Sequence, residues 1–180
     1  MTLLPKDAFP RSIRTGRLHL RKPEPAEESS CARHIFEAYA TASEPVSLGF
    51  AREIAAFTME HWARYGFGFL FVDLSENGQT PVTIGHAGFK YVGTYPAHWE
   101  ERPDGIELAY SLLPSARGSG YMTESARAAL GAAFTAFDVP KISARCHHSN
   151  PASAAVLARC GMTEIEPTEK FRRFELARPE

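Results

Sequence analysis

The sequence predicts a single α/β domain in which a mixed, mostly antiparallel sheet is flanked by about four helices. The expected elements follow one another in the order β, α, α, β, β, β, α, β, α, β, β. A chain of 180 residues is long enough for one domain with a substantial core. With 44% hydrophobic and 23% charged residues, its composition is that of a globular protein, so a packed fold is expected along most of its length.

The first half of the chain supplies a strand, two helices and a hairpin. Residues 1–14 contain two prolines and are expected to form a loose arm before a domain at 15–180. Apolar and polar residues alternate at 15–21, as in a half-buried strand, and a helix with an acidic first turn begins near Pro25. The expected elements are a strand at 15–21, helices at 25–40 and 51–65 separated by a loop at 41–49, and strands at 67–74 and 82–92 that form a hairpin around Glu76-Asn77-Gly78.

The second half contains the clearest helix of the chain. After a strand at 105–112, one helical stripe collects Met122, Ala126, Ala129, Leu130, Ala133, Phe134 and Phe137. Asn150 and Pro151 are a typical N-cap and first residue for a last helix that ends at Gly161. The remaining expectations are a loop with several aromatic residues at 93–104 and strands at 141–146, 163–165 and 170–176.

A turn rich in arginine and glycine joins the strand at 105–112 to the long helix. Its sequence is Arg117-Gly118-Ser119-Gly120-Tyr121-Met122. Such a turn directs backbone N–H groups toward one point in front of the positive end of a helix, which suits a phosphate, and an arginine adds a charged fork. The other interpretation is a tight turn with a solvated arginine. A Walker loop is excluded because no Gly-Lys-Ser/Thr follows, and a dinucleotide fingerprint is excluded because Thr123 stands where its third glycine belongs.

Charge, hydropathy and cysteine content exclude several classes of protein. The net charge of −1 gives no overall field that would attract nucleic acid. No apolar run reaches the roughly 18 residues of a membrane span, and the N-terminus lacks the apolar stretch of a signal peptide. The three cysteines are odd in number and unclustered, which indicates reduced thiols in a cytoplasmic protein. The histidines and Cys160 show no metal-ligand spacing, so no metal site is expected.

At this point the sequence resembles a known family. The segment 117–122 resembles the acetyl-CoA pyrophosphate loop Arg/Gln-x-x-Gly-x-Gly/Ala of the GNAT N-acetyltransferases, with Met122 as a departure that crowds the loop unless its side chain turns into the core. Three further segments resemble the ribosomal-protein N-acetyltransferase (RimJ/RimL-like) branch. They are Thr-x-Arg-Leu-x-Leu-Arg at 15–21, Thr-Glu-Ser at 123–125, and Asn-x-x-Ser…Gly-Phe at 150–162, where Met162 replaces the phenylalanine.

The resemblance implies a fold, a co-substrate and a set of binding residues. The central strand would splay from the next strand, with the pantetheine arm of acetyl-CoA in the gap and backbone groups near Leu112 and Leu113 holding that arm. A backbone N–H there would face the thioester oxygen. The implied acetyl-CoA contacts are Leu112, Leu113, Arg117, Gly118, Ser119, Gly120, Tyr121, Met122, Asn150 and Ser153.

Acetyl transfer to an amine requires a neutral amine, a stabilised oxyanion and a partner for the leaving thiolate. Glu107 is the candidate general base, because it is a carboxylate in the middle of a central strand and members of this branch often carry a glutamate there. Alternation predicts that Glu107 and Ala109 share one face of the strand while Ile106, Leu108 and Tyr110 share the other. The other interpretation of Glu107 is a carboxylate at the wet edge of the sheet or paired with an arginine.

Ser153 is the candidate partner for the thiolate. Many GNAT enzymes use a tyrosine seven residues after the asparagine as the general acid, but Leu157 occupies that position here. Members of the ribosomal-protein branch instead have a serine three residues after the asparagine. Ser153 and Asn150 both have a second interpretation as helix caps, and Asn150 is also a candidate contact of the pantetheine.

Two functions from different classes fit these features. The first is an N-acetyltransferase that moves an acetyl group from acetyl-CoA to a primary amine by direct attack, and the pair Glu107 and Ser153 favours it. The second is a non-catalytic acetyl-CoA-binding module, a sensor or scaffold, which Met122 and the missing tyrosine at 157 favour. The acceptor is a peptide N-terminal α-amine or a small-molecule amine, and the segment 41–49 is expected to border its site. The oligomeric state is open, although members of the branch are often homodimers.

Overall fold

A computed structural model describes residues 8–40, 42, 45–75, 80–95 and 98–179. Of these, residues 94, 95 and 98–104 are described by their backbone alone. The described residues form one eight-stranded sheet in the order β1-β2-β3-β4-β5-β6-β8-β7. All neighbouring strands are antiparallel except β5 and β6. The strands are β1 (Ser12–Arg14), β2 (Leu18–Arg21), β3 (Phe69–Leu74), β4 (Val82–Tyr95), β5 (His98–Leu112), β6 (Lys141–His147), β7 (Thr163–Ile165) and β8 (Phe171–Ala177).

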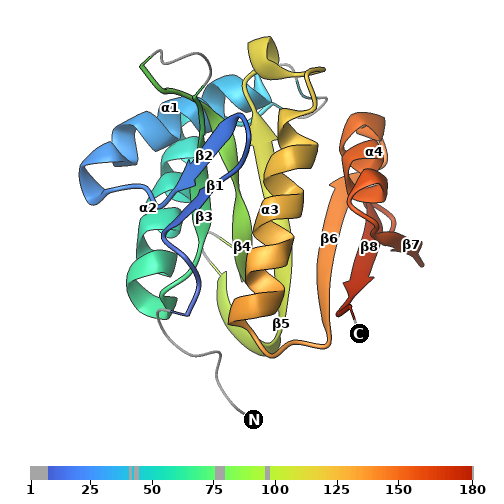
Figure 1. Ribbon diagram of the computed structural model, residues 1–180. Helices are drawn as coiled ribbons and strands as arrows, with labels where there is room; N and C mark the ends of the chain where they lie inside the picture. Colours follow the sequence, from blue (N-terminus) through green and yellow to red (C-terminus); the bar gives the residue numbers. More distant parts are fainter. Residues whose placement is uncertain (1–7, 41, 43–44, 76–79, 96–97, 180) are drawn as a thin grey trace.

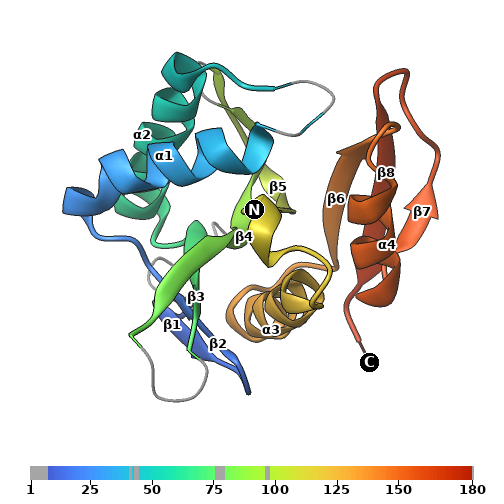
Figure 2. The same cartoon turned by 90° about the horizontal axis from the view of Figure 1, so that it is seen from above.

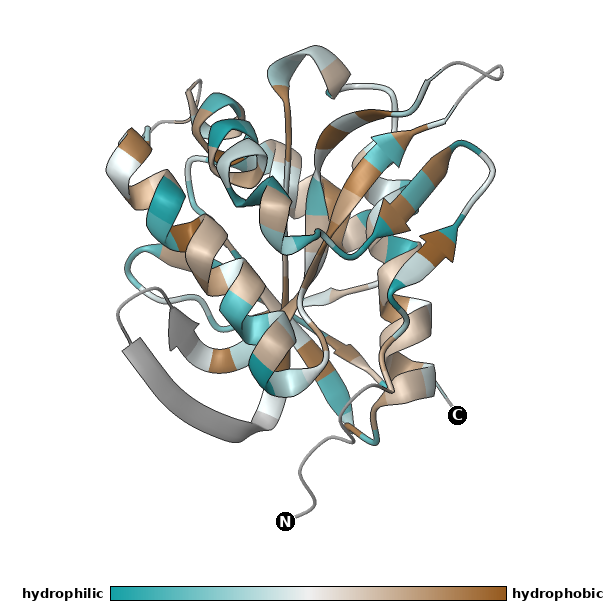
Figure 3. Cartoon of the chain, turned by 90° about the vertical axis from the view of Figure 1, so that its left-hand side faces the viewer, coloured by the Kyte–Doolittle hydropathy of each residue, from teal (hydrophilic) through white to brown (hydrophobic). Residues whose placement is uncertain are grey.

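Helices cover both faces of this sheet, as Figures 1 and 2 show. One face carries α1 (Glu28–Tyr39) and α2 (Leu48–Tyr65), and the other carries α3 (Tyr121–Ala136) and α4 (Pro151–Arg159). Short 3-10 turns precede α1 at Pro25–Glu27 and α3 at Pro114–Ala116. Hydrophobic residues follow the inner strands, while the helices show mixed bands of polar and apolar residues (Figure 3). This is the mixed α/β fold that the sequence predicts, since apolar stripes on the helices require a sheet to pack against.

The strands β5 and β6 separate along their length. Their parallel pairing covers only Ile106 to Leu108 against Ile142 to Ala144, whereas β5 continues to Leu112 and β6 to His147. Figure 2 shows the two strands diverging, with α3 beside β5 and α4 beside β6. The splay that the family resemblance implies is therefore present in this chain, and residues 109–112 have no strand partner in β6.

The N-terminal segment departs from the expectation of a loose arm. Residues 1–7 lie outside the described residues, but Ser12–Arg14 form edge strand β1 against β2. Phe9 is only 2% exposed, and its ring stacks on Phe137 with centroids 5.6 Å apart. An isolated apolar residue carries no periodic signal, so its place in the core depends on contacts with distant parts of the chain.

The prediction of a loop at 93–104 is also wrong. The structure continues β4 to Tyr95 and starts β5 at His98, so the two strands form a longer hairpin. The register shifts between Tyr91 and Val92 and again between Val92 and Thr94. Gly93 adopts φ 86°, the left-handed conformation that glycine allows at such a bulge, and pairing resumes beyond it. The side chains of Tyr95, His98 and Trp99, and the predicted turn at 76–78, lie outside the described residues.

The remaining expected elements are present with small shifts at their ends. Helix α2 begins three residues earlier than predicted because the Ser47 hydroxyl accepts a hydrogen bond from the Phe50 N–H at 3.1 Å. Helix α4 begins as predicted: Asn150 is its N-cap and its Oδ1 accepts from the Ser153 N–H at 3.0 Å. Among the described residues, no helix is long and apolar enough to cross a membrane.

A buried histidine makes stability depend on pH. His61 donates from Nδ1 to the Phe67 carbonyl at 2.7 Å and accepts from the Tyr91 N–H at Nε2, so both nitrogens of the neutral ring are hydrogen-bonded. Burial lowers the pKa of His61 to about 4, and burial lowers that of His86 to about 4 as well. Between pH ~6.5 and about 4 the unfolded chain binds protons that the folded chain does not, so stability falls as pH falls through this window.

We expect the free energy of unfolding in urea to decrease steadily from pH 7 to pH 4.5, by up to about 3 kcal/mol per histidine. His61→Gln removes one titrating group, so that variant is less stable at pH 7 but loses less stability on acidification. An unfolding midpoint that stays constant from pH 7 to pH 5 in the unmodified protein would contradict this account.

Candidate active site

The glycine turn ends at the N-terminus of α3. Gly118 and Gly120 adopt φ 85° and φ 80°, and Gly120 is the N-cap of the helix. No side chain caps α3, and its first intrahelical hydrogen bond runs from Glu124 N–H to the Gly120 carbonyl at 3.1 Å. The first turn thus presents backbone N–H groups without a side-chain cap at the positive end of a 16-residue helix. This arrangement fits the pyrophosphate of acetyl-CoA.

Met122 turns away from this loop. Its side chain is 6% exposed and belongs to the main hydrophobic core. The crowding expected of a methionine at this position therefore does not arise, and the surface of the turn consists of exposed Gly118, Ser119 and Gly120. A Cβ at Gly118 would meet nothing within 4 Å, so the glycine is required there by its φ and not by packing.

Arg117 connects the turn to α1. Its guanidinium donates from Nε to the Leu112 carbonyl at 3.2 Å and from Nη2 to the Ala38 carbonyl at 2.5 Å. Ala38 lies in the last turn of α1, where carbonyls lack helical partners and the dipole favours a cation. Arg117 therefore connects the turn to α1 on the opposite face of the sheet. Its role in binding phosphate oxygens stays a prediction.

Arg17 is a residue at this loop that the sequence reasoning missed. Its Nη1 donates to the Ser119 carbonyl at 3.1 Å, and its guanidinium lies over the Tyr121 ring at 4.5 Å. Glu124 holds it in place with an ion pair of 2.7 Å, and the Thr15 hydroxyl donates to the same carboxylate at 2.5 Å. The Thr-x-Arg motif at 15–17 was the sequence signal that could have pointed to Arg17. This motif contacts Glu124, although 107 residues separate Arg17 from Glu124.

A tyrosine and a serine face each other at the splay between β5 and β6. The Tyr110 hydroxyl lies 3.0 Å from the Ser153 Oγ and 3.0 Å from the Ser153 carbonyl, joining β5 to the start of α4. Burial raises the pKa of Tyr110, so this phenol keeps its proton at neutral pH. Ser153 thus lies beside the splay, its role as the partner of the thiolate stays a prediction, and Tyr110 is a second hydroxyl that only the tertiary structure brings there.

Two main-chain groups at the end of β5 have partners within the protein. The Leu113 N–H donates to the Ile84 carbonyl at 2.9 Å, and the Leu112 carbonyl accepts from Arg117, so both groups have partners within the protein. Hydrogen-bonded and non-bonded positions alternate along an antiparallel pair. The register of Leu112 with Gly85 and of Tyr110 with Ala87 therefore points the Tyr110 N–H and carbonyl away from β4 and toward the splay.

Glu107 lies where the splay begins, at the last paired residues of β5 and β6. It is 8% exposed, and its Oε1 is 3.3 Å from Lys90 Nζ and 3.3 Å from Arg145 Nε. Lys90 is 4% exposed, and burial lowers its pKa even though Glu107 opposes that shift. The side chains of β5 divide between the two faces of the strand as expected. Glu107 contacts Lys90 and Arg145 on one face, while Tyr110 contacts Ser153 on the other. The pairing of Glu107 with an arginine, which the sequence left open, is also present.

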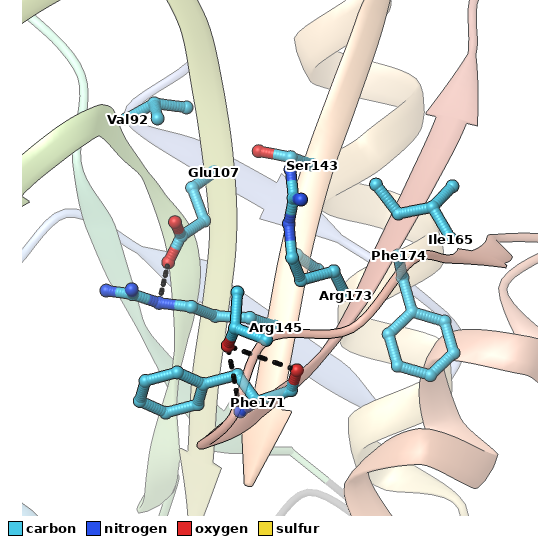
Figure 4. A pocket seen from close by; sticks show the side chains of 10 residues that line it. Val92, Glu107, Ser143, Arg145, Ile165, Phe171, Arg173 and Phe174 are labelled. Atoms are coloured by element: carbon cyan, nitrogen blue, oxygen red, sulfur yellow. Dashed lines mark hydrogen bonds and ion pairs between the residues drawn. The ribbon is translucent and has the colours of Figure 1, made fainter.

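A cavity of about 170 Å³ opens beside Glu107 (Figure 4). It is formed by β4, β5, β6, β7, β8 and the connection between β7 and β8. Its lining residues are Val92, Glu107, Ser143, Ala144, Arg145, Ile165, Thr168, Phe171, Arg173 and Phe174. In Figure 4 the Arg145 guanidinium extends toward the Glu107 carboxylate. The cavity thus joins a carboxylate and two arginines next to the splay.

The three cysteines and His86 lie in or beside the core. Cys31 and Cys146 are buried, Cys160 is partly buried, and all three are free thiols whose pKa burial raises. His86 is buried, and its Nδ1 lies 3.2 Å from the Ser111 hydroxyl. Within the part of the chain that the structure describes, no group of His, Cys, Asp and Glu residues could hold a metal ion.

The glycine turn at an uncapped helix N-terminus lies next to a splayed pair of parallel strands, an arrangement that suits the phosphates and arm of an acyl-coenzyme A. Residues 17–163 match the model of the acetyltransferase (GNAT) domain. Because this match covers most of the chain, the protein belongs to the GNAT acetyltransferase family and is an acetyl-CoA-dependent N-acetyltransferase. A comparison with curated protein sequences finds no match.

Solved structures with this fold include several acetyltransferases. One from Agrobacterium tumefaciens is 25% identical, with a TM-score of 0.73 over 92% of this chain and 93% of that one. RimL, the ribosomal L7/L12 α-N-protein acetyltransferase solved with coenzyme A, is 16% identical, with a TM-score of 0.70 over 92% and 97%. A Salmonella typhimurium acetyltransferase that modifies the N-terminal serine of L7/L12 is 15% identical, with a TM-score of 0.69 over 92% and 98%. These neighbours include the ribosomal-protein acetyltransferases that the sequence motifs resemble.

Proposed function

We propose that this protein transfers the acetyl group of acetyl-CoA to the α-amine of a peptide or protein by direct attack of the amine, in the cytoplasm. The observation that carries the proposal is the splay between β5 and β6, which has the glycine turn at one end and Glu107 at the other. Structural neighbours that acetylate ribosomal protein N-termini support a peptide acceptor over a small amine. An α-amine has a pKa near ~8, so it needs less help from a base than a lysine at ~10.4.

Acetyl-CoA supplies an acetyl group activated as a thioester. The N–H groups of Tyr121, Met122 and Thr123, together with Gly118 to Gly120, would hold its pyrophosphate. The Tyr110 main chain and Asn150 lie beside the splay where the pantetheine arm would pass. In this role the Tyr110 N–H, and not the Leu113 N–H, is the main-chain donor that faces the thioester oxygen.

Glu107 is the proposed acceptor of the amine proton, directly or through a water molecule. The carboxylate is buried, and Lys90 and Arg145 hold its Oε1 in one position. Accepting a proton would weaken both ion pairs, so a base in this setting suits an amine that is already partly neutral at pH 7 to 8. The geometry therefore favours an α-amine over a lysine side chain.

Ser153 is the proposed donor to the leaving thiolate, with Tyr110 behind it. The Tyr110 hydroxyl donates to the Ser153 carbonyl and lies 3.0 Å from the Ser153 Oγ, so a phenol that keeps its proton holds the serine in place while the serine hydroxyl donates to sulfur. This arrangement supplies a hydroxyl pair where other members of the family use a tyrosine of the last helix. Asn150 caps α4 and so fixes the position of Ser153.

We expect Ser153→Ala and Tyr110→Phe each to lower kcat by about tenfold or more, with little change in the Kd for acetyl-CoA. The Asn150 cap accepts from the Ser153 backbone N–H, so Ser153→Ala leaves the cap intact. Single-turnover acetylation measures the effect, and a thermal melt of each variant serves as the control. A loss of kcat matched by an equal loss of stability would mark the pair as structural.

The function is tested with two peptides of identical sequence, one with a free α-amine and one with an acetylated α-amine and a single internal lysine. Mass spectrometry should show acetyl-CoA-dependent acetylation of the first and little reaction of the second. Acetylation of the lysine alone would refute the α-amine proposal. Tight acetyl-CoA binding without transfer to any peptide or small amine would instead favour the non-catalytic module.

A further inference from the structure

Two arginines stand directly opposite each other at the cavity. Arg145 of β6 pairs in register with Arg173 of β8, and both line the cavity beside Glu107. Like charges at directly opposed positions of an antiparallel pair destabilise a sheet. An anion bound between the two side chains would offset this repulsion.

Among the described residues that line the cavity, the charged side chains are one carboxylate, Glu107, and two arginines, Arg145 and Arg173. Glu107 is shared by Lys90 and Arg145, at 3.3 Å from each. Glu175, the other carboxylate on this face of β8, is paired with Lys141 at 2.7 Å. Among the residues whose side chains are described, Arg173 has neither a hydrogen bond nor an ion pair. The described lining of the cavity therefore carries more positive than negative charge, centred on Arg145 and Arg173.

The position of Arg145 is set by its neighbours. Its guanidinium lies over the Phe171 ring at 4.9 Å, which orients the planar group while Nε is held by Glu107. An oriented guanidinium keeps its terminal N–H donors in the geometry that matches a carboxylate. The cavity volume of about 170 Å³ is far above the roughly 10–15 Å³ that a single water needs, so a side-chain carboxylate fits.

From this cluster we propose that the acceptor carries a carboxylate close to its amine, and that Arg145 and Arg173 bind this carboxylate. The inference rests on the proposed function, since an amine that reaches Glu107 brings its neighbouring groups into the same cavity. The source of the carboxylate is an acidic side chain at the second residue of the peptide, and the substrate class is therefore peptides with an acidic residue after the N-terminus.

The experiment compares two peptides that differ only in Glu or Gln at the second residue. We expect kcat/KM to be about tenfold or more higher for the Glu peptide, and calorimetry to show tighter binding of that peptide to the protein. Arg173→Gln should abolish the difference by lowering the value for the Glu peptide alone. Arg172→Gln is the matched control, because Arg172 is the adjacent residue on β8 and pairs with Glu164 at 2.7 Å.

Arg173→Glu provides a second test that does not depend on loss of activity. This variant should prefer a peptide with lysine at the second residue over the Glu peptide. Equal kcat/KM and equal Kd for the Glu and Gln peptides in the unmodified protein would overturn the inference while leaving the proposed function intact. A preference for free amino acids over their amides, lost in Arg173→Gln, would overturn the peptide as the source of the carboxylate.

Discussion

Gly120→Val is expected to raise the Kd for acetyl-CoA by at least about tenfold. Gly120 has φ 80°, and a β-branched residue in that conformation costs about 1–3 kcal/mol, so the turn would move to relieve the strain. The new Cβ would lie 3.7 Å from Arg17 Nη2, an ordinary contact, which makes backbone conformation and not steric overlap the cause. Displacement of the turn also displaces the N–H groups at the start of α3.

Calorimetric titration with acetyl-CoA measures this effect. Gly131→Ala is the control, because Gly131 lies within the same helix and a Cβ there meets nothing within 4 Å. That variant should bind acetyl-CoA normally and be slightly more stable, since alanine favours helix over glycine. An unchanged Kd for a folded Gly120→Val protein would remove the turn from the cofactor site.

Glu107→Gln is expected to lower kcat by about 10² or more near pH 7, while the Kd for acetyl-CoA changes little. The loss should shrink as pH rises toward 9, because a larger fraction of the α-amine is then neutral without a base. This pH dependence separates a proton acceptor from a residue that only holds the fold. The measurement is kcat against pH for both proteins with the same peptide.

The same substitution leaves Lys90 and Arg145 without their shared carboxylate, so the variant is also expected to be less stable. Adding Lys90→Met to Glu107→Gln removes the buried cation and should restore part of the stability but none of the turnover. Recovery of turnover in the double variant would show that Glu107 acts by neutralising Lys90 and not as a base.

Local patterns were enough to predict most elements of the fold. The apolar stripe after Met122, the Asn-Pro start of α4 and the glycine turn all depend on neighbours within a few residues, and the structure has each of them where the sequence indicates. Phe9 and the segment at 93–104 were missed for the opposite reason. Phe9 is buried by Phe137 and Phe89, and the hairpin continues past a bulge at Gly93 that only cross-strand pairing reveals.

The residues of the candidate site also fall into those that local sequence indicates and those that only the fold brings together. The sequence by itself determined the family and the turn at 117–122 and made Glu107 and Ser153 candidates, because these follow from motifs along the chain. Only the tertiary structure decided that Tyr110 meets Ser153, that Arg17 and Glu124 secure the glycine turn, and that Arg145 and Arg173 share a cavity with Glu107. The physical reason is that sheet register and helix docking bring these side chains together across up to 107 residues, and no local spacing encodes such contacts.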